Sequence, residues 1–214
     1  MKEKKYVLFA WILAGMLLFF AGFADAEEPE QNYSQLMEQA QKDRQAEKYR
    51  ESAIGAARAF FLADQSETRL KAAELSASSS ADAKKAGDEI KGTVSIVIDP
   101  AAGKLYLAEG ETIRKIFDVI CNSEFVLPAG KYIAGPKLSY PNYELNGNFH
   151  KAMTEENPLG ARWIEIQNEE GAGISGIHGR IEGTKEHLLF FSLQNKDMIE
   201  LFGLLAEGGR IDIK

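Results

Sequence analysis

The spacing of apolar residues changes its period once along this chain, near Gly92, and this change constrains the fold more than any other feature. Over residues 32–77, apolar residues recur at intervals of three, four and seven, the spacing of one face of an α-helix. Over residues 94–98 they alternate instead, as in a half-buried β-strand. We therefore expect a small helical module at residues 32–77 and a strand-rich domain at residues 92–214.

The strand-rich domain is predicted to mix strands with one late helix. The turn sequence Asp-Pro-Ala-Ala-Gly at residues 99–103 joins strands at 94–98 and 104–107, which is typical of a hairpin. Further strands are expected at residues 113–120, 130–134, 163–167, 176–178 and 210–213, and an amphipathic helix at 196–206. This order of elements predicts an α+β fold.

The helical module is predicted to be a helical hairpin, with Ser66 as the N-cap of a later helix. Its small residues at the helix crossing resemble a tetratricopeptide-type repeat, but the segment holds fewer than two copies. Repeats of this kind need roughly three copies to bury a core, so we expect the module to pack on the second domain or on a partner. Residues 78–91 are small and polar without periodicity, which predicts a linker.

The N-terminal 26 residues have the pattern of a secretory signal peptide. Lys2, Lys4 and Lys5 precede an uncharged apolar run at residues 6–23, and Ala-Asp-Ala at 24–26 offers a cleavage site. An apolar run of ~18 residues is also long enough to span a bilayer, so an uncleaved N-terminal anchor is the alternative. In both cases the rest of the chain is expected outside the cytoplasm, in the periplasm or cell envelope, with membrane contact only if the segment is uncleaved.

Charge and cysteine content exclude several classes of protein. The formal net charge is -7 and the segment after residue 26 has no Lys/Arg-rich block, which argues against a nucleic-acid partner. The single cysteine, Cys121, excludes an internal disulfide framework. His150, His178 and His187 have no metal-ligand spacing, so neither a metal nor a cofactor is expected.

Four short segments of the strand-rich domain occur in the same order as segments of a known protein family. They are Leu-Pro-Ala-Gly-Lys-Tyr at 127–132, Asn-Pro-Leu-Gly-Ala-Arg-Trp at 157–163, Gly-Ile-His-Gly at 176–179 and Asn-Lys-Asp at 195–197. In order and spacing, residues 92–214 resemble the catalytic domain of L,D-transpeptidases, the YkuD-type domain. The resemblance implies peptidoglycan stem peptides, or other envelope proteins, as partners.

The same resemblance implies a catalytic mechanism and a set of site residues. In the family a cysteine thiolate attacks the carbonyl of a stem tetrapeptide, expels the terminal D-amino acid and passes the acyl group to an amine. An activating histidine and backbone N–H groups assist this reaction. His178 matches that histidine. Arg162, Trp163 and Gly179 match positions near the substrate cleft.

This chain departs from the family motif at the nucleophile. The family motif is Ser-x-Gly-Cys-x-Arg, a few residues before Asn-x-Asp. With Asn195 aligned to that asparagine, Phe190 stands at the cysteine, Leu189 at the glycine before it and Ser192 at the arginine. A phenyl ring has no lone pair with which to attack, and twelve positions from His178 to Phe190 make a shorter loop than the family carries. We expect residues 187–191 to form a core strand and the domain to be catalytically silent, binding stem peptides or envelope partners.

Two other functions stay open from the sequence. The domain could remain an acyl transferase with Ser192 or Cys121 as nucleophile and His178 as base. Alternatively, the helical module could be a protein-interaction scaffold. Each candidate also has a structural interpretation: His178 holding two strands together, Cys121 as a buried apolar thiol, and Arg162 and Trp163 packing the sheet.

Overall fold

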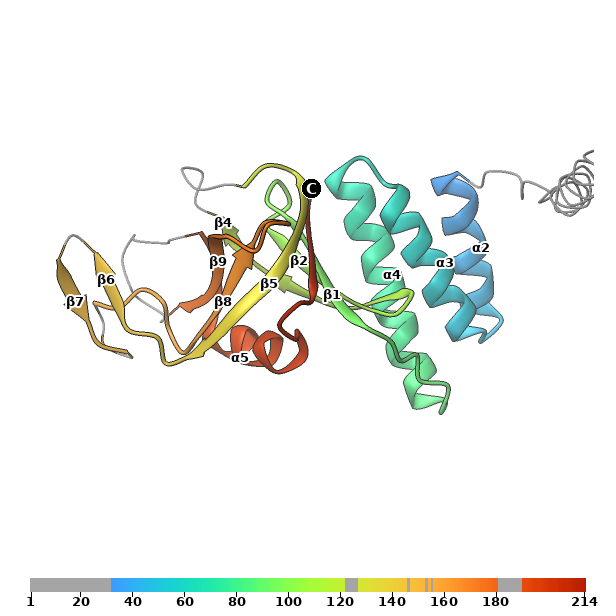
Figure 1. Cartoon of the computed structure of the whole chain (residues 1–214). Coiled ribbons are helices and arrows are strands. Elements are labelled where there is room, and N and C mark those ends of the chain that lie inside the picture. Colours follow the sequence, from blue (N-terminus) through green and yellow to red (C-terminus); the bar gives the residue numbers. More distant parts are fainter. Residues whose placement is uncertain (1–31, 122–126, 146, 153, 155, 181–189) are drawn as a thin grey trace, which may run out of the picture. The chain divides into compact units, whose positions relative to one another are not determined.

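A computed structural model describes residues 32–121, 127–145, 147–152, 154, 156–180 and 190–214. The expected signal peptide lies outside these residues. Three helices stand beside a large mixed sheet (Figure 1): α2 (Tyr33–Gln45), α3 (Tyr49–Leu62) and α4 (Ser66–Lys85). A fourth helix, α5 (Asn195–Leu204), lies between the last two strands in sequence. The α+β class predicted from the sequence is confirmed.

The main sheet has nine strands in the order β3-β2-β1-β11-β5-β8-β9-β10-β4, and β6 and β7 form a separate hairpin. The strands are β1 (Val94–Asp99), β2 (Lys104–Glu109), β3 (Thr112–Asp118), β4 (Ile120–Cys121), β5 (Gly130–Ser139), β6 (Tyr143–Leu145), β7 (Asn148–His150), β8 (Arg162–Gln167), β9 (Gly173–Arg180), β10 (Phe191–Gln194) and β11 (Arg210–Ile213). Each strand expected from alternation is present, although the expected strand at 113–120 is divided into β3 and β4.

The two outer strands of the main sheet, β3 and β4, are consecutive in the chain. Only Val119, which is buried, separates them. The chain therefore passes from one edge of the sheet directly to the other, and β10 also contacts β3. This connection requires the sheet to curl on itself, which gives it an inner and an outer face.

The inner face of the curled sheet holds the main core. Apolar residues from strands across the sheet, among them Ile96, Ile164, Ile177 and Phe191, are buried together there. Helix α5 contributes Met198 and Leu201 to the same core and contacts β8, β9 and β10. The predicted amphipathic helix is thus present, and its apolar stripe faces the inside of the sheet.

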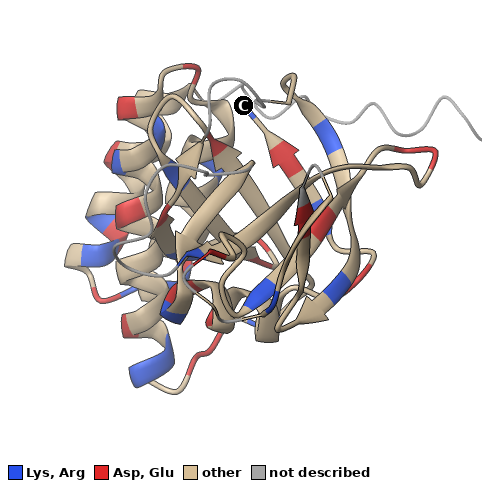
Figure 2. Cartoon of the chain, turned by 90° about the vertical axis from the view of Figure 1, so that its left-hand side faces the viewer, with Lys and Arg blue, Asp and Glu red and all other residues tan. Residues whose placement is uncertain are grey.

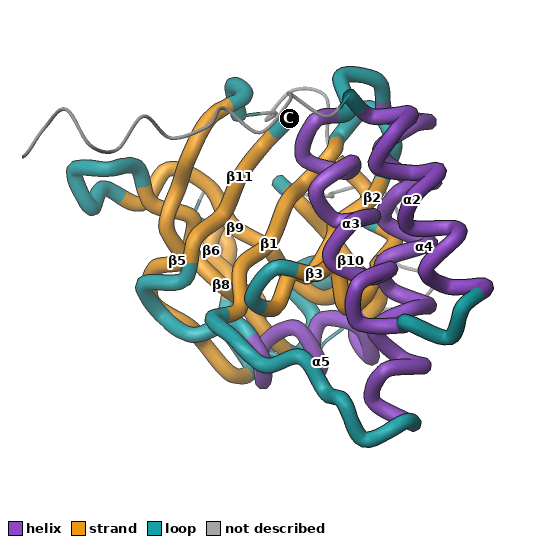
Figure 3. Tube along the Cα trace, turned by 90° about the vertical axis from the view of Figure 1, so that its right-hand side faces the viewer, coloured by secondary structure: helices purple, strands orange, loops and turns teal. Residues whose placement is uncertain are grey.

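The helical module covers part of the outer face (Figure 3). Phe60 of α3 and Ala72 and Ala73 of α4 share a second core with Val97 and Tyr106 of β1 and β2. The rings of Phe60 and Tyr106 meet edge to face, with centroids 4.8 Å apart. The helical module therefore packs on the sheet, which is one of the two alternatives that its shortage of repeats predicted, and residues 32–214 form one compact unit.

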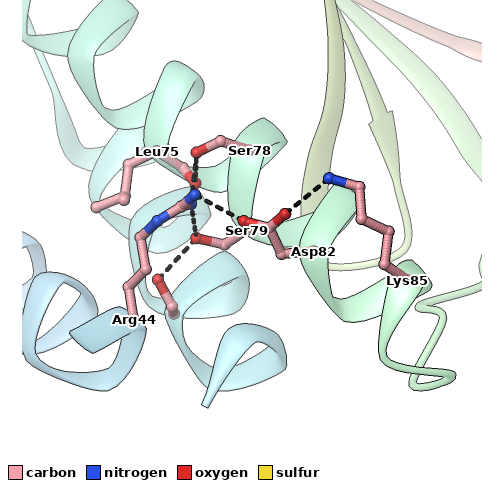
Figure 4. A network of polar contacts seen from close by, with 7 residues as sticks. Arg44, Leu75, Ser78, Ser79, Asp82 and Lys85 are labelled. Carbon is pink, nitrogen blue, oxygen red and sulfur yellow. Dashed lines mark hydrogen bonds and ion pairs between the residues drawn. The ribbon is translucent and has the colours of Figure 1, made fainter. Parts of the chain in front are cut away.

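The predicted linker at residues 78–91 is largely wrong, because α4 continues to Lys85 and only residues 86–91 lack a helix or strand. Its serines are helical because they have partners across the helix packing. Arg44 of α2 donates to the Oγ atoms of Ser78 (2.6 Å) and Ser79 (2.9 Å) and pairs with Asp82 (Figure 4). Alanines between the serines keep a high helix propensity.

Ser76 of α4 joins the helical module to the edge strand β3. Its Oγ donates to the carbonyl of Ala53 in α3 (2.8 Å) and accepts from the N–H of Ile113 in β3 (3.0 Å). Ser80 also reaches the carbonyl of Ile113, at 3.5 Å. An edge strand needs such cover, because unpaired backbone groups invite pairing with other chains.

A buried ion pair fixes the start of α4 against the end of β1. Arg69 pairs with the carboxylate of Asp99, and the two side chains are 7% and 1% exposed. Asp99 also accepts from Ser66 Oγ (3.0 Å) and from the backbone N–H of Ala102 (3.0 Å). The prediction that Ser66 is the N-cap of this helix is therefore wrong. The cap position is Gln65, and the Ser66 hydroxyl is used in the contact with the sheet.

The surface of the helical module mixes both signs of charge (Figure 2), in part through the i,i+4 pairs Lys42–Glu38 and Lys71–Glu67. Among the described helices, none is both long enough and apolar enough to cross a membrane.

Candidate functional site

The predicted site residues Trp163, His178 and Ser192 form one row across three neighbouring strands. Trp163 of β8 pairs in register with His178 of β9, and His178 pairs with Ser192 of β10. Residues paired in register project from the same face of a sheet. Since Ile164, Ile177 and Phe191 form the alternate row in the core, this row lies on the outer face.

His178 is fully buried and its ring is held from two sides. Its Nδ1 lies 2.6 Å from the carbonyl oxygen of Gly179, so the Nδ1–H is the donor of this hydrogen bond. The Trp163 indole is stacked against it, with centroids 6.3 Å apart and planes 20° apart. Imidazole is a common general base, and a histidine held by these contacts also fits the structural interpretation, in which it joins neighbouring strands.

Phe190, at the motif position of the nucleophile, lies beside this pair. Its ring meets the Trp163 indole edge to face, with centroids 5.8 Å apart. Its backbone has a φ of 63°, a left-handed conformation that bulky residues rarely adopt. The expected strand at 187–191 is therefore wrong at Phe190, since β10 begins at Phe191. The rest of that segment, including His187 and Leu189, lies outside the described residues.

Ser192 is next to His178 but is enclosed by protein. Its exposed fraction is zero, and its Oγ has no hydrogen-bond partner among the residues that the structure describes. The register thus brings this candidate nucleophile and the candidate base to the same face of adjacent strands. A substrate carbonyl has no open path to the hydroxyl while it is buried in this way.

Cys121 is on the other face of the sheet. It pairs in register with Phe191 and packs against the inner core, so its side chain points away from the row that contains His178. Burial, with a smaller contribution from the Asp99 carboxylate, raises the pKa of the thiol to about 11. The structure therefore does not bring Cys121 and His178 together, and the thiol is protonated near neutral pH.

Arg162 also lies on the opposite face of the sheet from His178, because it alternates with Trp163 along β8. Its guanidinium lies over the rings of Tyr140 (4.7 Å) and Phe202 (5.3 Å) and donates to the carbonyl of Ala161 (2.7 Å). Of the four predicted substrate-binding residues, Trp163, His178 and Gly179 are neighbours, whereas Arg162 packs against α5.

The glycines and asparagines of the matched segments act as packing and hydrogen-bonding residues around the site. Asn157 is buried and donates to the carbonyls of Pro141 (2.9 Å) and Lys151 (3.1 Å), which anchors the β6–β7 hairpin. Asn195 Oδ1 accepts from Ala161 N–H (2.9 Å). A Cβ on Gly160 or Gly179 would lie 2.4 or 2.2 Å from that same oxygen, so neither position has room for a side chain.

Within the described part of the chain, no group of His, Cys, Asp and Glu side chains is arranged to hold a metal ion. His150 stacks on Tyr143 in the β6–β7 hairpin, away from β9. A cavity of about 140 Å³ lies elsewhere, between α4 and the β2–β3 turn, where Lys84 pairs with Glu89 and Arg114 with Glu109. It includes none of the predicted site residues.

Two polar residues beside Trp163 were missed from the sequence. Glu165 and Gln167 continue the outer row of β8, and Gln167 Nε2 donates to Glu165 Oε1 (2.9 Å). The signal that could have identified them is the glycine at every second or third position over residues 171–179, which leaves space for neighbouring side chains.

No family model and no curated protein matches the sequence. The solved structures that align with it include a mutant of an Enterococcus faecium L,D-transpeptidase, over 59% of this chain and 52% of that one, with 16% identity and a TM-score of 0.43. An L,D-transpeptidase from Mycobacterium tuberculosis H37Rv aligns over 57% of each chain, with 11% identity and a TM-score of 0.44. The ertapenem-acylated catalytic domain from E. faecium aligns over 57% of this chain and 98% of its own, with 15% identity and a TM-score of 0.43. This chain thus spans little more than half of the first two proteins, and all three belong to the family that the sequence motifs resemble.

Proposed function

We propose that residues 92–214 form an L,D-transpeptidase-like domain that binds peptidoglycan stem peptides and does not transfer them. The proposal rests mainly on the position of the Phe190 side chain. Its phenyl ring lies against Trp163, which is itself stacked on His178. The residue that the motif assigns to nucleophilic attack is thus a hydrocarbon beside a retained histidine.

Acyl transfer requires a nucleophile within hydrogen-bond reach of its base and an open path for the substrate carbonyl. Ser192 has the neighbouring base but is fully buried. Cys121 projects from the opposite face, and its raised pKa keeps it protonated. Each alternative nucleophile therefore lacks one of the two requirements, which favours binding without covalent chemistry.

The same proposal places the domain outside the cytoplasm, because residues 1–26 have the pattern of a signal peptide. Sequencing the N-terminus of the protein from a cell-envelope fraction tests this part. A mature chain that begins after Ala26 supports secretion with cleavage. An intact chain in the membrane fraction supports the anchor, and an intact chain in the cytosol contradicts export.

Binding can be followed through one residue. The chain has two tryptophans, Trp11 and Trp163, so a Trp11→Phe chain reports the site alone by fluorescence. We expect a saturable change in the Trp163 emission when a synthetic stem tetrapeptide is added. The matched control is the same peptide with a scrambled sequence. An emission spectrum that the tetrapeptide leaves unchanged contradicts the proposal.

Covalent chemistry is tested by intact mass spectrometry after incubation with a stem-tetrapeptide muropeptide and, separately, with a carbapenem. We expect an unmodified mass under conditions in which an active L,D-transpeptidase is acylated. A covalent adduct would show that the domain is an enzyme. Repeating the reaction with Ser192→Ala and Cys121→Ser chains would then identify the residue that carries it.

A further inference from the structure

Three side chains of β8 lie flat on the outer face of the sheet because glycines stand beside them. A Cβ on Gly176 would lie 2.1 Å from the Trp163 ring, one on Gly173 would lie 2.5 Å from the Glu165 carboxyl carbon, and one on Gly135 would lie 2.7 Å from the Gln167 amide. Each large side chain therefore rests on backbone. We name Trp163, Glu165 and Gln167 the β8 track.

The β8 track is a prearranged surface that solvent reaches. All three side chains are half-buried. Glu165 and Gln167 hold each other through the 2.9 Å hydrogen bond, and Trp163 is fixed by His178 and Phe190. Ile174 of β9 (40% exposed) and Ile133 of β5 (37% exposed) also lie on this outer face. Side chains fixed before binding lose little conformational entropy when a ligand arrives.

We propose that the β8 track binds a neutral saccharide chain, such as the glycan strand of peptidoglycan. That the polymer is peptidoglycan rests on the proposed function. The inference adds the glycan strand of peptidoglycan as a ligand, besides its stem peptides. An indole lying flat offers an apolar surface to the C–H face of a sugar ring. The Glu165 carboxylate accepts hydrogen bonds, and the Gln167 amide both donates and accepts, as hydroxyl and acetamido groups require.

The position of β8 within the sheet excludes one common mode of peptide binding on the β8 track, the addition of a strand. Extended peptides commonly bind by adding a strand to a sheet edge through backbone hydrogen bonds. Strand β8 pairs with β5 on one side and β9 on the other, so its backbone is not free for such pairing. A ligand on the β8 track must therefore be recognised by side chains alone.

The dimensions and charge of the track agree with this ligand. Residues at alternate positions along a strand place the three side chains over about 13 Å, a length comparable with a short oligosaccharide. The single carboxylate of the track disfavours anionic ligands by like-charge repulsion, whereas an uncharged sugar pays no such cost.

The test is a titration of the full-length Trp11→Phe chain with tri-N-acetylchitotriose, an uncharged oligosaccharide, followed by Trp163 fluorescence. We expect a saturable blue shift with a Kd on the order of millimolar that added salt does not change. Glu165→Ala is expected to weaken binding about tenfold through loss of a charged hydrogen bond. The matched control, Glu169→Ala, removes an exposed carboxylate outside the track and should change the Kd less than about twofold.

A Trp163→Leu chain, measured by calorimetry, should lose saccharide binding while its circular dichroism is unchanged. The inference is overturned if the trisaccharide leaves the fluorescence unchanged while the stem tetrapeptide shifts it. It is also overturned if Glu165→Ala and Glu169→Ala weaken saccharide binding equally. Saccharide binding without tetrapeptide binding would support the β8 track and contradict the proposed peptide function.

Discussion

At the scale of single residues, Cys121 provides a direct test of why this domain is expected to be silent. Burial raises the pKa of its thiol to about 11 from an ordinary 9.0, so at pH 8 we expect iodoacetamide to react about a hundredfold more slowly than with the unfolded chain. The alkylation rate as a function of pH, with a urea-unfolded control, measures this. A half-maximal rate near pH 9 in the folded protein would contradict it.

The raised pKa of Cys121 also makes the free energy of unfolding depend on pH, and the direction of this dependence follows from the direction of the pKa shift. The folded chain holds the Cys121 proton more tightly than the unfolded chain, because the folded pKa is the higher of the two. The contribution to the free energy of unfolding is therefore present below about pH 9 and is lost as the pH rises towards 11. A Cys121→Ser chain should lose that alkaline dependence.

The Arg69–Asp99 pair is a buried ionic contact that attaches the helices to the sheet. We expect Arg69→Met to lower the free energy of unfolding by about 3–5 kcal/mol, because it leaves the buried carboxylate of Asp99 without a cation. The exposed pair Arg50–Asp88 is the matched control, and Arg50→Met should cost less than about 1 kcal/mol. Urea denaturation of both chains compares them, and equal losses would contradict this prediction.

At the scale of elements, the sequence predicted strands and helices well where the period of apolar residues was regular. Strands β1, β2 and β8 and helix α5 lie where alternation or helical spacing placed them. The second half of α4 was missed because its buried residues are serine and alanine, which carry no hydrophobic signal. Their burial depends on partners far away in sequence, such as Ile113 for Ser76. The same holds for the site, where the register that joins His178 to Ser192 depends on long-range pairing.

Ser76 tests the interpretation of α4 as the cover of an edge strand. We expect Ser76→Ala to lower the free energy of unfolding by about 1–3 kcal/mol, because the buried N–H of Ile113 loses its partner and the carbonyl of Ala53 loses one of the bonds it accepts. Ser78→Ala, on the exposed side of the same helix, is the control and should cost less. Thermal and chemical denaturation measure both, and a neutral Ser76→Ala would contradict this account of the edge.

At the scale of the whole molecule, residues 32–214 should unfold in one step. Helices and sheet share a core that includes Phe60 and Tyr106, so neither part keeps its buried surface without the other. In the Trp11→Phe chain, circular dichroism follows the helices and Trp163 fluorescence follows the far side of the sheet. The two urea transitions are expected to coincide, and separate midpoints would show that the helical module is an independent domain.

Strand β11, the last strand in sequence order, lies in the middle of the sheet between β1 and β5. This placement sets an order in time: the sheet is incomplete until Ile213 has been synthesised, and pairing between segments so distant in sequence is slow. Until β11 is made the sheet lacks a central strand, and a chain with an incomplete sheet can still be threaded through a translocation channel. Ribosome-bound chains that end before Arg210 should therefore be digested by protease as readily as unfolded ones.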